Sequence, residues 1–354
     1  MKLKIGEPTL RLEDERLLRG AGCFTDDIDP GEGLRVAFLR APFAHARLTA
    51  LDLEGARALA GVHLVASQAD LDADQVCDIT CSLNLQNEDG SDMVKVSKPA
   101  MVREINRSAG DIVAMVVAES QQIANDALEL IDARYDAMDA VADVYAAMAD
   151  GAPQLYAEYE NNIALNWVAA DHAGTSAAFA TAADKGLDMV EIDVVNSRVI
   201  INALETRSMI AGPGERPGTL DIWCGTQGPV PIAEKLAVVL NMPVSDVRVR
   251  TPDVGGGFGY KIFLYPEQVA IAWAARRLGR RIRWQQTRSD GFLSDLQGRD
   301  NRSRVRALVD HEGRVHAAEV TVHVNLGSWL SNFGPGVPTL SGSRTLTTNY
   351  SIPH

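Results

Sequence analysis

The feature that most constrains the fold is the segment from Asp111 to Glu119, "DIVAMVVAE", whose interior is an unbroken apolar run. A short apolar run between charged residues is typical of a strand buried on both faces of a sheet. Ser120 follows directly and is expected to cap a helix over "QQIANDALELIDARY". A strand that leads straight into a capped helix predicts a mixed α/β fold. The helix would present one apolar stripe, made of Ile123, Ala124, Ala127, Leu128 and Ile131.

The rest of the chain continues this mixture of strands and helices. Residues 34–41, "LRVAFLRA", have the pattern of a second buried strand. Residues 265–278 have the pattern of a helix, and Gly279 is expected to end it. The run "SRVRALVDHEGRVHAAEVTVHVNLG" alternates polar and apolar residues on both sides of Gly313, which is typical of a β-hairpin.

The periodic pattern weakens over residues 136–162, which are rich in Ala and Asp and contain Gly-Ala-Pro. We interpret this segment as a linker. A chain of 354 residues is long enough for two domains, at a prior of roughly 150 residues per domain. The predicted architecture is α+β, or mixed α/β, with a first domain over residues 10–135 and a second over residues 163–354.

The composition excludes several classes of protein. The formal net charge is −13, whereas nucleic-acid-binding proteins normally carry a basic face. No apolar run of about 18 residues occurs, so no membrane-spanning helix is expected. No signal-peptide pattern opens the sequence, and of four cysteines only Cys77 and Cys81 lie close together, with no second pair to complete a metal site. We therefore expect a cytoplasmic protein.

The segment from Thr251 to Lys261, "TPDVGGGFGYK", contains three consecutive glycines and a fourth after Phe258. Glycine permits positive φ and lets a ligand touch the peptide, and consecutive free amides can donate to an anion or oxo group. A dinucleotide loop is excluded, because its third glycine would have to stand at Tyr260, and the P-loop pattern also fails. A tight turn without a ligand remains an alternative, but Phe258 then needs a core to pack on.

A second candidate is Gln227 in "WCGTQGP", at the end of a predicted strand. Its amide can both donate and accept hydrogen bonds. This loop and the glycine loop follow strands that flank one predicted helix, and loops of that kind converge on a ligand crevice. On the residues alone, a surface turn remains the alternative.

Five segments in one order resemble the large molybdenum-binding subunit of the xanthine dehydrogenase and aldehyde oxidase family, which includes bacterial carbon monoxide dehydrogenases. The resemblance runs from about Leu10 to His354. Five segments in a fixed order are more specific than any one of them. They are "RLLRGAGCFTDDI", "FLRAPFAHARLTALD", "AGDIVAMVVAES", "GTQ", and "DVGGGFGYK" followed by "YPEQVAIAWAARRLGRRIRWQQTR".

The resemblance implies a fold and a set of site residues. The fold would be an a/b hammerhead-like domain followed by the first part of a molybdenum-cofactor-binding domain. Gln227 would hydrogen-bond a terminal oxygen ligand of molybdenum, and Phe258 would line the substrate pocket. Gly256, Gly257 and Gly259 would let the backbone approach the cofactor closely.

The resemblance also implies a reaction, cofactors and partners. The reaction would be oxidative hydroxylation of an aldehyde, an N-heterocycle or a similar small substrate, with water as the oxygen source. The cofactor would be molybdenum-molybdopterin in its cytosine dinucleotide form. Electrons would pass to [2Fe–2S] clusters and FAD on partner subunits.

Two departures from the family pattern stand out. Thr206 replaces a proline that the family often carries between Glu205 and Arg207. The family's subunits are also more than twice as long, and their glutamate base is expected beyond His354, so no catalytic residue is assigned here. We therefore expect a C-terminal half or a second large-subunit chain as a partner. A catalytically incomplete fragment or a non-catalytic partner-binding remnant is the alternative.

Overall fold

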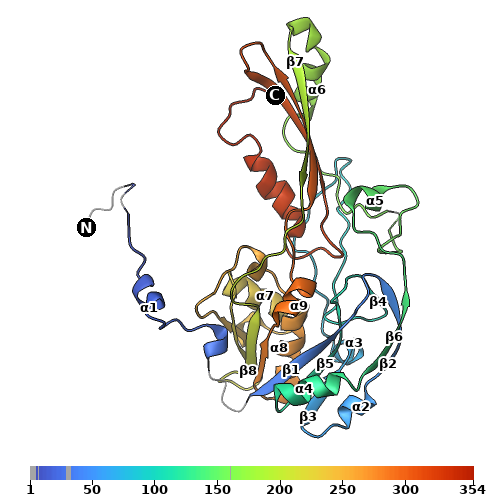
Figure 1. Ribbon diagram of the computed structural model, residues 1–354, viewed down its shortest axis with the longest axis vertical. Helices are drawn as coiled ribbons and strands as arrows, with labels where there is room; N and C mark the ends of the chain where they lie inside the picture. Colours follow the sequence, from blue (N-terminus) through green and yellow to red (C-terminus); the bar gives the residue numbers. More distant parts are fainter. Residues whose placement is uncertain (1–4, 7, 29–32, 160) are drawn as a thin grey trace.

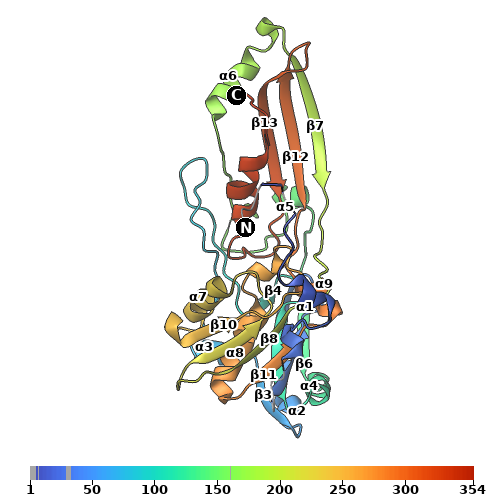
Figure 2. The ribbon, with the colours of Figure 1, turned by 90° about the vertical axis from the view of Figure 1, so that its left-hand side faces the viewer.

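The computed structural model describes residues 5–6, 8–28, 33–159 and 161–354. The described chain has a body built on one large sheet and a narrower arm that rises from one end of it (Figures 1 and 2). The body contains most of residues 34–137 together with residues 208–294, and the arm contains a three-stranded sheet. The chain is therefore a mixed α/β structure, as the sequence predicts.

The body is organised by a seven-stranded sheet in the order β10-β9-β8-β11-β1-β5-β3. Strands from both predicted domains share this sheet, because β1 pairs in parallel with β11. The boundaries at residues 135 and 163 stay a prediction. The strands are β1 (Leu34–Arg40), β3 (Val62–Ala66), β5 (Ile112–Ala118), β8 (Ser208–Pro213), β9 (Leu220–Cys224), β10 (Val247–Arg250) and β11 (Ile282–Gln285).

Helices cover both faces of this sheet. On one face, α8 packs against β8 and α7 against β10, and α4 packs against β1 on the other. Every residue of β5 is buried: Met115 and Val117 face the α7–α8 side, and Ala114 and Val116 face the α4 side. This confirms the predicted doubly buried strand. The helices are α1 (Asp14–Leu18), α2 (Glu54–Arg57), α3 (Gln68–Ala73), α4 (Gln121–Leu128), α7 (Pro229–Val239), α8 (Pro266–Leu278) and α9 (Arg288–Ser294).

The predicted helix after β5 begins as expected but is too long. The Ser120 hydroxyl accepts a hydrogen bond from the Ile123 amide at 3.2 Å, so the predicted cap is confirmed. The helix ends at Leu128, and the last part of the predicted helix belongs to a strand, β6 (Asp132–Ala137). Here pairing with β2 overrides helical propensity. A second, small sheet results, in the order β4-β2-β6, with β2 at Ala46–Asp52 and β4 at Ile105–Asn106.

The arm is the sheet β13-β12-β7, with β7 (Asp188–Asn196) at its edge, β12 (Asn301–Val309) and β13 (Val315–Val324). The last two strands confirm the predicted hairpin. Helix α6 (His172–Ala180) lies beside the arm, and the amide of Ala318 donates to the carbonyl of His354 at 2.8 Å (Figure 2). Between the body and the arm, a short helix, α5 (Val144–Met148), lies in the predicted linker. No helix in the described ranges is long and apolar enough to cross a membrane.

Candidate functional site

The two predicted site loops lie side by side. Strands β9 and β10 are parallel neighbours, so the loops at their carboxyl ends, residues 225–228 and 251–259, leave the same edge of the sheet. The Thr226 hydroxyl donates to the carbonyl oxygen of Lys261 at 2.7 Å, and the Gln227 amide donates to the same oxygen at 3.1 Å. The convergence predicted from the order of elements is confirmed.

The side-chain amide of Gln227 has a fixed orientation. Its Oε1 accepts a hydrogen bond from the backbone N–H of Gly259 at 2.9 Å. A backbone N–H can be satisfied only by the oxygen of the carboxamide, so the Nε2 group must point away from the loop. Gln227 is exposed, and among the described residues no hydrogen bond uses its Nε2. Gln227 therefore presents two free N–H donors to whatever binds beside the loop.

Two of the glycines are required by this geometry. A Cβ at position 257 would lie 2.6 Å from Cδ of Gln227, so a side chain there would push Gln227 out of place. Gly256 has φ +105°, in the region that residues with a side chain rarely adopt. The loop is thus built for close contact between its backbone and the amide of Gln227.

Three consecutive backbone amides of the loop have no protein partner. In the part of the chain that the structure describes, no hydrogen bond uses the N–H of Gly256, Gly257 or Phe258, whereas the N–H groups of Gly255 and Gly259 are bonded. Successive unpaired amides in a turn with positive φ make an anion-binding concavity. We call these three unpaired N–H groups, together with Nε2 of Gln227 in the adjacent loop, the donor cluster.

Phe258 is not a core residue. Its side chain is 76% exposed and its backbone φ is +47°, a strained conformation for a bulky residue. The alternative in which Phe258 packs into the core is therefore wrong. An exposed aromatic ring beside unpaired donors is suited to be the wall of a ligand pocket.

A buried ion pair between Lys261 and Glu205, which the sequence did not reveal, anchors the glycine loop. Nζ of Lys261 lies 2.8 Å from Oε2 of Glu205, and the same oxygen accepts a hydrogen bond from the Gly255 amide at 2.8 Å. Burial lowers the pKa of Lys261, and the hydrogen bond from Lys261 to Glu205 opposes this shift. The two residues are 56 positions apart in the chain, so no local pattern predicts their pairing.

A second buried network lies next to this anchor and ties β1 to the second half of the body. Arg207 makes two hydrogen bonds to Glu267, at 3.0 and 3.2 Å, and one to Asp295 at 2.6 Å. Glu267 is also bonded to Arg40 of β1 at 2.9 Å. Burial alone would raise the pKa of Glu267, but the charges of Arg207 and Arg40 outweigh it and lower the pKa to about 2. Glu267 is therefore a structural carboxylate and not a proton acceptor at neutral pH.

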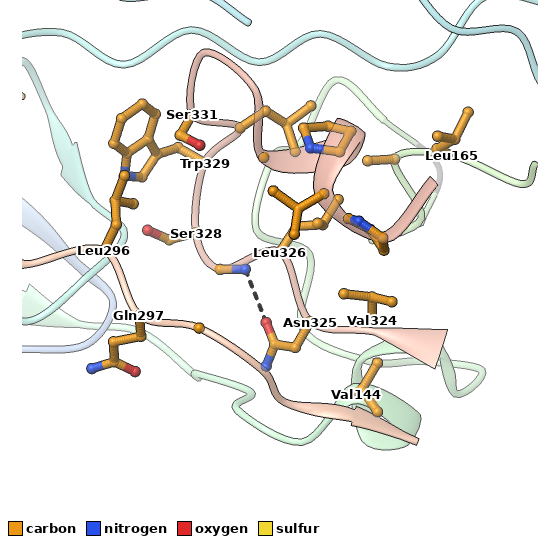
Figure 3. A pocket seen from close by; sticks show the side chains of 18 of the residues that line it. Val144, Leu165, Leu296, Gln297, Val324, Asn325, Leu326, Ser328, Trp329 and Ser331 are labelled. Carbon is orange, nitrogen blue, oxygen red and sulfur yellow. Dashed lines mark hydrogen bonds between the residues drawn. The ribbon is translucent and has the colours of Figure 1, made fainter. Parts of the chain in front are cut away.

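A cleft of about 2130 Å³ separates the body from the arm, and Phe258 and Gly259 contribute to its lining. Gln227, Gly256 and Gly257 lie outside that lining. Figure 3 shows part of the cleft, where apolar side chains predominate. Those labelled include Val144, Leu165, Val324, Leu326 and Trp329.

Other candidates have structural roles. His45 is buried, and its Nδ1 lies 2.8 Å from the carbonyl oxygen of Asp139, so it is a packed structural residue. Within the ranges that the structure covers, no group of three or more His, Cys, Asp or Glu side chains could hold a metal ion.

Two regions of the chain match the models of known protein families. Residues 155–354 match the molybdopterin cofactor-binding domain, and residues 19–139 match the aldehyde oxidase and xanthine dehydrogenase a/b hammerhead domain. The chain is 28% identical over 326 residues to the nicotine 6-hydroxylase large subunit of Paenarthrobacter nicotinovorans, covering 92% of this chain and 38% of that protein. It is 28% identical over 355 residues to the carbon monoxide dehydrogenase large chain of Afipia carboxidovorans, covering 97% of this chain and 42% of that protein.

Among solved structures, quinoline 2-oxidoreductase from Pseudomonas putida 86 superposes with a TM-score of 0.80 and 33% sequence identity, over 91% of this chain and 39% of that one. The chain thus spans about two fifths of the length of the relatives it matches. The molybdopterin-binding match covers more than half of the chain and includes both site loops. The chain belongs to the molybdopterin-binding family of aldehyde oxidases and xanthine dehydrogenases.

Proposed function

We propose that this chain forms part of the large subunit of a molybdenum hydroxylase, and that its glycine loop and Gln227 bind the molybdenum–molybdopterin cofactor. The observation that carries the proposal is the cluster of unpaired donors: the amides of Gly256, Gly257 and Phe258 beside Nε2 of Gln227. An electron-rich group with several oxygen acceptors is the ligand that such a cluster requires. The donor set fits the cofactor that the family binds.

The proposed roles follow from the position of each residue. Nε2 of Gln227 would donate to a terminal oxygen ligand of the metal, and the loop amides would donate to the cofactor from the backbone. When bound, the cofactor would supply Lewis-acid activation of water and a two-electron acceptor. The protein's contribution in this loop is to position the group and to exclude side chains from its surface.

Phe258 would form one wall of the substrate pocket, next to the metal. The substrate class is an aldehyde, an N-heterocycle or a similar small molecule. The relatives are named for nicotine, carbon monoxide and quinoline, and nothing in the described residues favours one of these. The proton acceptor of the reaction is not assigned to this chain, since Glu205 and Glu267 are both committed to ion pairs.

The proposal extends to the rest of the electron path. We infer a cofactor in the cytosine dinucleotide form and partner subunits that carry [2Fe–2S] clusters and FAD, which rests on the family alone. A cytoplasmic location is supported by the cysteines, because all four are unpaired thiols, as in a reducing compartment.

We further infer that a second polypeptide segment, either a C-terminal half or a second large-subunit chain, packs against the arm. One face of the arm sheet is mostly apolar, with Ser303 as a polar residue between Val194 and Val322, and antiparallel sheets normally bury such a face on a core. The opposite face carries ion pairs, such as Arg304 with Asp193. The cleft is also larger than the roughly 300–1,000 Å³ typical of small-molecule pockets. The apolar face consists of Val190, Ile192 and Val194 of β7, Val305 and Ala307 of β12, and Ala318, Val320 and Val322 of β13.

The test is metal and pterin analysis of the purified chain, alone and after co-expression with the product of the adjacent downstream reading frame. We expect little molybdenum on the chain alone and stoichiometric molybdenum and pterin on the pair. Gln227→Ala should lower the molybdenum and pterin contents of the pair several-fold, because the variant loses the Nε2 donor. The side chain of Gln227 is exposed, so the core is unchanged. Gln122→Ala, an exposed glutamine of α4, is the matched control.

Two results would contradict these proposals. Stoichiometric molybdenum on the isolated chain would overturn the requirement for a second polypeptide. Equal metal and pterin contents in the wild-type and Gln227→Ala pairs would overturn the role of the donor cluster.

A further inference from the structure

Lys261 is a buried cation two residues after the glycine loop, and it does not line the cleft. Its side chain is 1% exposed, and its ammonium group is bonded to Glu205 at 2.8 Å. A charge held this far from solvent needs its partner, because an unpaired buried charge is strongly unfavourable. The cofactor role proposed above does not use either residue.

Glu205 holds both ends of the glycine loop at once. Oε2 accepts from the Gly255 amide at the start of the loop and from Lys261 at its end. The backbone amide of Glu205 also donates to the carbonyl of Gly255 at 3.1 Å. Oε1 is buried and has no partner among the described residues, so these two donors are all that stabilises the carboxylate. One oxygen atom of Glu205 therefore links the two ends of the loop.

Lys261 transmits this constraint to Gln227. Its carbonyl oxygen accepts hydrogen bonds from the Thr226 hydroxyl and the Gln227 amide. From the other direction, Gly259 fixes the orientation of the Gln227 side chain. A continuous set of hydrogen bonds thus runs from Glu205 through Lys261 to the free Nε2 donors.

We propose that Lys261 and Glu205 are positioning residues that hold Gln227 and the three unpaired amides in one arrangement without touching the ligand. The inference rests on the proposed cofactor-binding function. In this arrangement the ion pair keeps the donors oriented before the cofactor arrives, and the donors need no reorganisation on binding. The ammonium group contributes through geometry and not through contact.

The first test is hydrogen exchange on the 354-residue chain, which needs no cofactor. Lys261→Met leaves the carboxylate of Glu205 with one donor. We expect the amides of Gly255, Gly259 and Gln227 to exchange about tenfold faster or more, the effect of losing one charge-assisted hydrogen bond. Lys235→Met is the matched control, because Lys235 is half-buried, has a pKa lowered by burial and makes no ion pair among the described residues. It should leave these amides unchanged.

A double variant separates positioning from general stability. Lys261→Met alone should lower the urea midpoint, because it leaves the carboxylate of Glu205 with only the Gly255 amide as a donor. Glu205→Gln combined with Lys261→Met removes both charges, so the urea midpoint should return toward the wild-type value. The loop amides should still exchange fast, since the neutral pair has no ammonium to join the two loop ends. Slow exchange in the double variant would show that Lys261 acts only by neutralising Glu205, and would overturn the proposal.

The second test measures molybdenum and pterin in the co-expressed pair. We expect Lys261→Met to lower both contents about fivefold or more, with Lys235→Met unchanged. Faster exchange with normal cofactor content would overturn the positioning role, and so would unchanged exchange. If even the wild-type pair contains no cofactor, the proposed function fails, whereas the exchange measurements still decide what Lys261 does to the loop.

Discussion

The buried network around Arg207 makes a prediction about stability. Arg207 is surrounded by Glu267 and Asp295 and stacks on the ring of Tyr265 at 3.7 Å. Replacing it with methionine keeps the apolar contact with Tyr265 but leaves two buried carboxylates with fewer partners. Glu267 would retain Arg40, whereas Asp295 would retain only a neutral donor, Gln286. We therefore expect Arg207→Met to be strongly destabilising.

The magnitude follows from the pKa of Glu267. This pKa is lowered from 4.5 to about 2, and each pKa unit corresponds to about 1.4 kcal/mol. The interactions of the ionised carboxylate thus stabilise the fold by about 3 kcal/mol. Removal of one partner from a buried ion pair typically costs about 3–5 kcal/mol. Both routes lead to an expected loss of about 3–4 kcal/mol in the free energy of unfolding.

The lowered pKa of Glu267 also determines how the stability of the fold changes with pH. A lowered pKa in the folded state gives stability that is present above pH 4.5 and is lost as the pH falls toward 2. In Arg207→Met the pKa of Glu267 should move back up, so the stability should depend less steeply on pH between 4.5 and 2. Urea titrations at pH 7 and at several values down to pH 3 measure both effects.

Arg304→Met is the control for this experiment, because Arg304 forms an exposed ion pair with Asp193 on the arm. Exposed ion pairs contribute little, and no measurable change is expected. A loss below about 1 kcal/mol for Arg207→Met, against the expected loss of about 3–4 kcal/mol, would refute the reasoning. So would an acid dependence identical to that of the wild type.

Two further predictions concern the site and the arm. Gly257→Ala should lower the molybdenum and pterin content of the co-expressed pair several-fold, because its Cβ would lie 2.6 Å from Cδ of Gln227. Gly298→Ala is the control and should leave both contents unchanged, because its Cβ would have no neighbour closer than 3.8 Å. Equal losses in both variants would contradict the steric argument. Ile192→Asp should weaken binding of the second polypeptide about tenfold in a titration with the purified partner, without unfolding the chain, because Ile192 is 56% exposed. Thr321→Asp on the opposite face is its control, and comparable binding by both variants would rule out the apolar face as the interface.

The sequence predicted those parts of the fold that local patterns determine. The run from Ile112 to Ala118 is a strand buried on both faces, and Ser120 caps the following helix. The predicted end of that helix was wrong, because the tertiary pairing of β6 with β2 determines where the helix stops. Strand β8, "SMIAGP", was missed, since a short run that ends in Gly-Pro lacks a clear strand pattern.

The candidate site also combines features that the sequence predicts with features that only the tertiary structure determines. The approach of Gln227 to the glycine loop could be predicted, because adjacent parallel strands bring their following loops together. The ion pair of Lys261 with Glu205 and the network of Arg207 could not, since their members come from distant segments. The parallel pairing of β1 with β11, which joins the two halves of the body, depends equally on tertiary structure.

The most direct test of the central claim is a crystal structure of the molybdenum-loaded enzyme. The account predicts the pterin against the amides of residues 256–258, with Nε2 of Gln227 about 2.7–3.2 Å from a terminal oxygen of the metal, the range of an N–H···O hydrogen bond. A metal bound elsewhere, with Gln227 and the glycine loop facing solvent, would contradict it.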